Sequence, residues 1–154
     1  MVNFGTAGGF QELGSEIASV YLSGHFRYHD RQIPISSSWE AYGAGDYRFS
    51  IPETLKEFPQ AIVSSGNALT IEPHQQTSML ELGKASGLPV VKDMEGAAIA
   101  QVCQMKSVPL LSIKSVTDLI DGGRHTHEEF LENFERATDA LQKVVAEVQA
   151  LIAT

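Results

Sequence analysis

The chain has 154 residues, of which 43% are hydrophobic and 19% are charged, a balance typical of one globular domain and not of a disordered chain. Its formal net charge of -8 argues against nucleic-acid binding as a main role, because phosphate backbones require clustered Lys and Arg. No apolar run approaches the length of a membrane span, and the single cysteine, Cys103, excludes an internal disulfide. We therefore expect one cytoplasmic domain, residues 1–154, without a nucleic-acid or membrane partner.

The chain opens with a short apolar stretch that leads into glycines. Residues 2–4 predict a buried strand, and Gly5-Thr6-Ala7-Gly8-Gly9 predicts a turn whose backbone can approach a ligand. This turn lacks the spacing of a dinucleotide-binding loop and the Lys of a phosphate loop. Residues 16–28, rich in Ile, Val, Tyr and Phe, predict a long strand. Residues 31–52 contain many Gly, Pro and Ser and predict a long loop of a kind that is usually functional or mobile.

Strand and helix patterns alternate in the second half of the chain. Residues 61–66 predict a strand ending in a turn, and residues 75–86 predict a helix that Gly87 stops. Residues 88–91 then predict a short strand, followed by a helix over residues 94–106 with small residues on one side. The alternation indicates an α/β architecture.

The last two elements complete the predicted fold. Residues 109–116 are apolar almost throughout, which favours a strand in a sheet covered on both faces. Thr126-His127-Glu128-Glu129 has the pattern of a capping box, and apolar residues at helical spacing as far as Leu151 predict an amphipathic helix. We therefore expect an α/β fold with a mixed, mostly parallel sheet flanked by helices.

Several chemically active residues follow predicted strands. In open α/β sheets, ligands bind at the carboxyl ends of the strands, where the glycine turn, Gly66, Asp93 and Asp118 are predicted to lie. Glu95 could accept two hydrogen bonds from a sugar diol, and Asp118 could pass a proton to a leaving base. Two carboxyl groups in different environments are what cleavage of a glycosidic bond requires.

Each of these residues also has a simpler explanation. Acidic residues such as Glu95 favour the first turn of a helix, and Asp118 could cap the turn after its strand. Cys103 fits a small buried side chain better than a nucleophile. His125 and His127 lie in a polar turn without further ligands nearby in the sequence, so we expect no metal site.

The order of several motifs makes the functional explanation more specific. The motifs are Gly5-Thr6-Ala7-Gly8-Gly9-Phe10, Tyr28-His29-Asp30, Ser65-Gly66-Asn67, Asp93-Met94-Glu95-Gly96-Ala97-Ala98 and Lys114-Ser115-Val116-Thr117-Asp118. Together they resemble the 5′-methylthioadenosine/S-adenosylhomocysteine nucleosidases of the nucleoside phosphorylase superfamily, and Asp121-Gly122 most resembles the plant-type branch. The resemblance implies a phosphorylase-like fold. It also implies hydrolysis of the N-ribosidic bond of methylthioadenosine, or S-adenosylhomocysteine, to adenine and the thioribose in methionine salvage.

The resemblance implies a role for each matching residue. In the catalytic group, Asp118 protonates or hydrogen-bonds N7 of adenine, Thr117 helps to orient it, and Lys114 occupies a basic position lining the region beside the sugar and the attacking water. The residues implied to bind substrate are Glu95 on the ribose hydroxyls, Met94 against the sugar, Leu69 and Thr70 at adenine, and Thr6, Ala7 and Gly8 beside the sugar and the attacking water.

The resemblance also implies what surrounds this site. Water is the nucleophile, so neither a metal nor an organic cofactor is expected. A homodimer is expected, in which the segment around Tyr28-His29-Asp30 contributes to the alkylthio pocket of the neighbouring subunit. In the family, a strand carrying a glutamate that activates the water precedes the glycine turn, and the resemblance implies that this chain is truncated before that turn.

Three alternatives remain open on the sequence. A nucleoside phosphorylase would use phosphate as the nucleophile and would need a cluster of basic residues. A non-catalytic nucleoside-binding or storage relative would bind without turnover. A partner fragment that supplies the first strands would complete an otherwise inactive chain.

Overall fold

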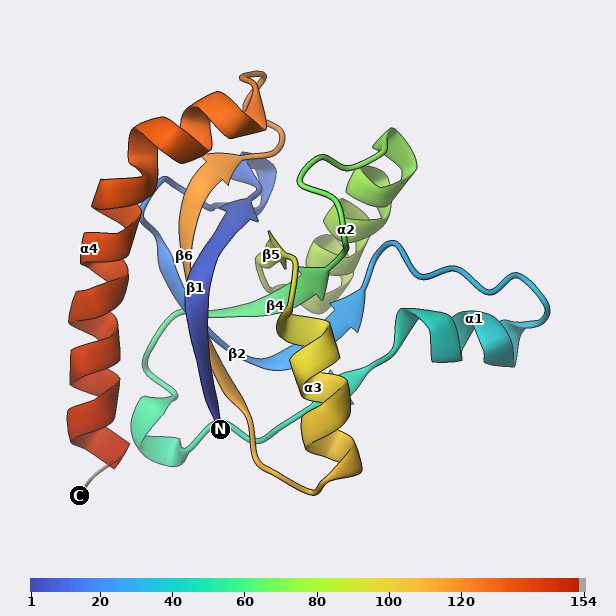
Figure 1. Cartoon of the computed structure of the whole chain (residues 1–154), viewed down its shortest axis with the longest axis horizontal. Helices are drawn as coiled ribbons and strands as arrows, with labels where there is room; N and C mark the ends of the chain where they lie inside the picture. The colour runs from blue at the N-terminus through green and yellow to red at the C-terminus, as the bar shows by residue number, and fades with distance from the viewer. Residues whose placement is uncertain (153–154) are drawn as a thin grey trace.

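The structure, a computed structural model, describes residues 1–152 and forms a mixed sheet with helices packed around it (Figure 1). The strands are β1 (Val2–Gly9), β2 (Val20–Tyr28), β3 (Tyr47–Arg48), β4 (Gln60–Ser65), β5 (Val90–Asp93) and β6 (Leu111–Leu119). The α-helices are α1 (Ser37–Ala44), α2 (Pro73–Ser86), α3 (Gly96–Met105) and α4 (Thr126–Ile152), with short 3-10 helices η1 (Gln11–Leu13) and η2 (Glu53–Leu55). None of the described helices is both long and apolar enough to cross a membrane.

The strand order is β3-β2-β4-β5-β1-β6, and β2 also pairs with β6. Strands β1 and β6, β2 and β4, and β4 and β5 run parallel and contain most of the paired residues, whereas β2 pairs antiparallel with β3 and β6. The expected mixed, mostly parallel sheet is therefore confirmed. Strands β1 and β5 meet near their carboxyl ends, where Gly8 pairs antiparallel with Lys92.

The glycine-rich segment is the main error in the predicted secondary structure. Residues 5–9 are not a turn but continue β1, because their backbone pairs with β6 as far as Gly9 opposite Leu119. The register shifts between Ala7 and Gly8. The predicted burial of residues 2–4 is also wrong, since the Phe4 side chain is 56% exposed. The chain turns only after β1, at η1, which ends at Gly14 in the left-handed conformation.

Two other segments differ from the prediction at their ends. Strand β2 begins at Val20 and not at residue 16, and the predicted loop 31–52 contains α1 and β3. The proposed capping box is not formed as expected: Thr126 is already the first helical residue, and the Glu129 carboxylate accepts a hydrogen bond from the Leu119 amide at 2.8 Å.

The remaining predicted elements are confirmed within a few residues. Helix α2 ends at Gly87, whose φ of 69° is the left-handed conformation that favours glycine. Strands β4, β5 and β6 and helices α3 and α4 also lie where periodicity placed them. In Figure 1, α4 runs along β6 on one side of the molecule, whereas α2 and α3 lie on the other.

The helices bury their apolar faces in separate clusters. Helix α3 contributes Ala97, Ala100 and Cys103 to a cluster against the sheet, so the expectation of a buried Cys103 is confirmed. Helix α4 contributes Leu141 and Val148 to a second cluster. These contacts fix both helices against the sheet, which in turn fixes the loops that lead into them.

Gly24, within β2, lies against the backbone of a neighbouring segment. A Cβ atom at this position would lie 2.2 Å from the carbonyl oxygen of Phe49. We expect Gly24→Ala to lower the free energy of unfolding by about 1–3 kcal/mol, because the backbone must shift to remove the overlap. Urea denaturation measures this loss.

Gly5→Ala in β1 is the matched control. Its new Cβ would lie 3.7 Å from the Lys114 ammonium nitrogen, an ordinary contact. Equal losses of stability in the two variants would contradict the steric explanation for Gly24.

Candidate active site

A cavity of about 240 Å³ lies where the carboxyl ends of β1, β5 and β6 come together. Its walls are formed by Thr6, Ala7, Gly8, Leu69, Lys92, Asp93, Met94, Glu95, Thr117, Asp118, Thr126 and Phe130. The fold thus gathers the candidate site residues from segments far apart in the sequence. Lys114 and Thr70 are the exceptions among them: Thr70 lies exposed beside Leu69 and outside the cavity wall.

Asp118 is one of two buried carboxyl groups of this cavity, and the other, Asp93, is paired with Lys114. Asp118 lies near the end of β6, and 4% of the residue is exposed. Burial raises the pKa of the Asp118 carboxyl, and the nearby Glu129 carboxylate raises it too, while a hydrogen bond from Thr117 and the positive charge of Lys92 act in the opposite direction. The net shift is upward, which favours the protonated form. Asp118 can therefore hold a proton for transfer.

The orientation of Asp118 is set by its neighbours on β6 and β1. The Thr117 hydroxyl donates a hydrogen bond to Asp118 Oδ1 at 2.8 Å and lies 3.3 Å from the Ala7 carbonyl oxygen. The Asn133 side chain of α4 donates a hydrogen bond to the Thr117 carbonyl at 3.2 Å. A Cβ at Gly8 would lie 2.9 Å from Asp118 Oδ2, so glycine there leaves room for the carboxyl group.

Glu95 is the exposed carboxyl group of the same cavity. It lies between β5 and α3 at the N-cap position of the helix, with φ of -132° and ψ of -29°. Met94, next to it, is 42% exposed and presents an apolar side chain to the cavity. Besides the ion-paired Asp93, the site therefore combines a buried carboxyl group, Asp118, and a solvated one, Glu95, in a single cavity.

Lys114 does not line the cavity but contacts Asp93, which does. Its ammonium nitrogen lies 2.8 Å from Asp93 Oδ2, and the two side chains are 3% and 1% exposed. Asp93 also accepts hydrogen bonds from the Ser65 hydroxyl at 2.5 Å and from the Gly96 amide at 3.0 Å. Lys114 thus supports the turn that carries Glu95, whereas the sequence placed it among the residues lining the reaction region.

Sequence reasoning missed three residues of the cavity wall. Lys92 is 5% exposed, and its ammonium donates hydrogen bonds to the carbonyls of Ala68 at 2.6 Å and Leu69 at 2.7 Å. A charged residue directly after the apolar pair of a predicted strand was the signal available for it. Thr126 and Phe130, from the first turns of α4, reach the cavity because that helix starts close to the end of β6.

Comparison with known proteins places the fold in a family. A model of the phosphorylase superfamily matches residues 1–150. The chain belongs to the phosphorylase superfamily. This membership confirms the phosphorylase-like fold expected from the sequence motifs.

Within the superfamily, two similar proteins of known name are nucleosidases. A 5′-methylthioadenosine/S-adenosylhomocysteine nucleosidase and a 5′-methylthioadenosine nucleosidase of Arabidopsis thaliana are each 38% identical to the chain over 151 residues. The match covers 96% of this chain but 57% and 54% of those two relatives, so the chain spans little more than half of their length. A crystal structure of an MTA/SAH nucleosidase superposes with a TM-score of 0.88 at 38% identity, over 99% of this chain and 61% of that one. The resemblance to this nucleosidase family is therefore confirmed.

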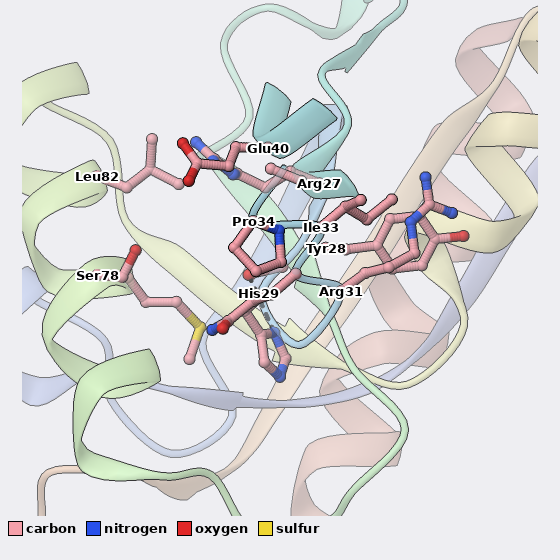
Figure 2. A pocket seen from close by; sticks show the side chains of 13 residues that line it. Arg27, Tyr28, His29, Arg31, Ile33, Pro34, Glu40, Ser78 and Leu82 are labelled. Atoms are coloured by element: carbon pink, nitrogen blue, oxygen red, sulfur yellow. Dashed lines mark hydrogen bonds between the residues drawn. The ribbon is translucent and has the colours of Figure 1, made fainter. Parts of the chain in front are cut away.

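The Tyr28-His29-Asp30 segment of this superfamily member lies outside the cavity that holds Asp118. Tyr28 and Asp30 line a neighbouring cavity of about 280 Å³, which shares Met94 with the first. His29 faces a further cavity, shown in Figure 2, and its Nδ1 lies 3.2 Å from the Ser64 hydroxyl. Asp30 instead accepts a hydrogen bond from the Asn67 amide at 2.7 Å. His29 and Asp30 therefore have separate hydrogen-bond partners and do not form a catalytic pair.

No group of three or more metal-ligating side chains is found within residues 1–152. The rings of His125 and His127 lie 5.9 Å apart in the turn before α4.

The buried pair below the cavity gives a direct prediction about stability. We expect Lys114→Met to lower the free energy of unfolding by about 3–5 kcal/mol, because the Asp93 carboxylate would remain buried without its counter-ion. Chemical denaturation followed by circular dichroism measures the change.

Lys84→Met is the matched control, since Lys84 forms an ion pair with Glu12 on the surface. Removal of an exposed pair should cost far less, because water solvates the remaining carboxylate. Similar losses for both variants would show that burial of the Lys114 pair has no special consequence.

Proposed function

We propose that the chain hydrolyses the N-ribosidic bond of 5′-methylthioadenosine, or of S-adenosylhomocysteine, to adenine and the thioribose. The observation that carries the proposal is the pair formed by Asp118 and Glu95, one buried and one exposed carboxyl group on the wall of one cavity. Such a contrast lets one group donate a proton while the other stays ionised. The names of the Arabidopsis relatives, both nucleosidases, support this substrate class.

The proposed reaction breaks the bond between C1′ of the ribose and N9 of adenine. The bonding electrons leave with the base, so positive charge develops on the sugar and negative charge on the purine. Asp118 donates a proton to N7, which neutralises the departing base. Water adds to C1′ and loses a proton, which completes the hydrolysis.

Glu95 and its neighbours act on the sugar and the base. The Glu95 carboxylate accepts hydrogen bonds from the ribose hydroxyls and stabilises the positive charge on the ring electrostatically. Thr117 keeps Asp118 oriented toward the base through its 2.8 Å hydrogen bond. Met94, Leu69 and Phe130 provide apolar surface for the sugar, the base and the thioether substituent.

The composition of the cavity favours water over phosphate as the nucleophile. A phosphorylase site requires several positive groups to bind the dianion. Among the described residues of the cavity wall, Lys92 is the cationic one, and its ammonium already donates to two backbone carbonyls. We therefore assign the reaction as hydrolysis, without a metal or organic cofactor.

One observation favours a second candidate, a nucleoside-binding protein without turnover. A hydrolase needs a base that activates the attacking water. Of the acidic residues that line the cavity in the described part of the chain, Asp93 is paired with Lys114, and Asp118 and Glu95 already have the roles given above. A chain that binds adenine but does not release it from methylthioadenosine would have this second function.

Adenine release tests both candidates directly. The purified chain is incubated with 5′-methylthioadenosine, with and without phosphate, and adenine is quantified by chromatography. Hydrolysis predicts release that is independent of phosphate, whereas release that requires phosphate would identify a phosphorylase. Binding of adenine by calorimetry without any release supports the binding protein, and neither binding nor release rejects both candidates. Parallel assays with S-adenosylhomocysteine determine the thioether preference.

The proposal extends to the setting of the reaction. Adenine release from methylthioadenosine belongs to methionine salvage, and a cytoplasmic homodimer is the form that we propose. The surface of α1 and the segment that leads into it supports self-association, because Ile35, Trp39 and Tyr42 are 73%, 49% and 59% exposed. Sedimentation of the purified chain at several concentrations tests the oligomeric state.

The raised pKa of Asp118 gives a pH prediction with a definite sign. Because the protonated form is the active acid, the rate should fall as pH rises through the pKa of Asp118. Asp118→Asn cannot donate this proton, so we expect a loss of about 10²–10⁴-fold in kcat and the disappearance of that limb of the pH profile.

Asp139→Asn, on the exposed surface of α4, is the control for charge removal. It should leave the rate and the profile unchanged. A wild-type pH profile retained by Asp118→Asn would exclude Asp118 as the general acid.

A further inference from the structure

Lys92 is a buried cation at the centre of the cavity wall, and the sequence motifs give it no role. It lies near the carboxyl end of β5, where it pairs with Gly8 of β1. Gly8 in turn leaves room for the carboxyl group of Asp118. Lys92 is therefore placed where β1, β5 and β6 meet.

The contacts of Lys92 join the sheet to the segment between β4 and α2. Its ammonium donates to two successive carbonyls, Ala68 at 2.6 Å and Leu69 at 2.7 Å. Residues 67–70 are exposed and lie outside helices and strands, and Asp30 holds one end of this segment through Asn67. Hydrogen bonds from a charged donor are roughly twice as strong as those between neutral groups. Lys92 is thus well suited to fix the position of Leu69 in the cavity wall.

The charges around Lys92 connect it to the carboxyl groups of the site. Burial lowers the pKa of the Lys92 ammonium, while Asp118, Asp93, Glu95 and Asp30 all act to raise it. The net shift is downward. The same ammonium opposes the upward shift in the pKa of Asp118.

Asp118 is faced by a defined set of groups on the elements around it. Thr117 of β6 donates a hydrogen bond to it, Lys92 of β5 carries a positive charge, and Glu129 of α4 carries a negative charge. Lys92 is the cation of this set. Its removal would therefore weaken the opposition to the upward shift that burial and Glu129 cause in the pKa of Asp118.

We propose that Lys92 is a positioning residue of the purine site, which clamps the carbonyls of Ala68 and Leu69 so that residues 67–71 form a fixed wall beside Asp118. The clamp acts through the backbone and not by contact with the reacting atoms. Because the clamp is assigned to a purine site, this inference rests on the proposed nucleosidase function.

Hydrogen exchange of the free protein tests the clamp without any assay of activity. In Lys92→Met, the Asn67 amide, which donates to Asp30 Oδ2 at 2.7 Å, should exchange about tenfold faster, because loss of both charge-assisted hydrogen bonds from Lys92 frees the segment that carries it. Lys92→Arg keeps a charged donor and should retain most of the protection. Lys106→Met, which removes an exposed lysine at the end of α3, is the matched control.

Two functional measurements separate positioning from a purely structural role. We expect Lys92→Met to weaken adenine binding about tenfold in calorimetry, with Lys92→Arg intermediate. In the rate assay, loss of the positive charge should raise the pKa of Asp118, so the fall in activity should move to higher pH. Lys106→Met should change neither quantity.

The outcomes decide between the clamp and the wider proposal. Unchanged exchange of the Asn67 amide in folded Lys92→Met would overturn the clamp, whatever the activity. If wild-type protein neither binds adenine nor cleaves methylthioadenosine, the proposed function fails, and exchange alone decides whether the clamp exists. Should Lys92→Met lose its circular dichroism signal, Lys92→Leu, which has neither donor nor charge, replaces it with the same expected exchange and the same overturning result.

Discussion

The buried ion pair between Asp93 and Lys114 is the interaction on which the arrangement of the site depends. It joins the end of β5 to β6, and the Ser65 hydroxyl extends it to β4. Ser65 also accepts a hydrogen bond from the Ala97 amide at 2.7 Å, which ties the start of α3 to the same network. Because each buried polar group has a partner, the network can be rigid without the penalty of an unpaired charge. The turn that carries Glu95 is therefore held from below.

Above this network, burial separates the properties of the two carboxyl groups. Asp118 is enclosed by β1, β6 and α4, and the resulting loss of hydration raises its pKa. Glu95, two residues after Asp93, extends from a helix start into solvent. Lys92 lies between the sheet and the segment 67–71. Nearby carboxylates stabilise its positive charge, and its ammonium donates hydrogen bonds to two backbone carbonyls. The proposed acid and the proposed clamp are thus both buried, whereas the proposed sugar ligand is exposed to water.

Much of the fold follows from local patterns, and the errors have identifiable causes. Apolar periodicity placed α2, α3, α4 and the strands between them, since each element buries one face or both. Residues 5–9 were predicted as a turn because glycines are typical of turns, yet here a parallel neighbour supplies the hydrogen bonds that keep them in a strand. For Lys114, the family resemblance implied a basic position lining the reaction region, whereas its partner in the structure, Asp93, lies on another strand.

The sequence by itself determined the order of elements, the superfamily and most residues of the cavity, because motifs such as Met94-Glu95 and Thr117-Asp118 are contiguous in the chain. Only the tertiary structure decided which charges are buried and what they face. Lys92 and Lys114 look alike in the sequence, because each lies in an apolar strand. In the structure, Lys92 donates to a backbone carbonyl at the cavity, whereas Lys114 forms an ion pair with the Asp93 carboxylate. That difference arises because strand order and register bring together groups far apart in sequence, and burial then sets the strength of their interaction.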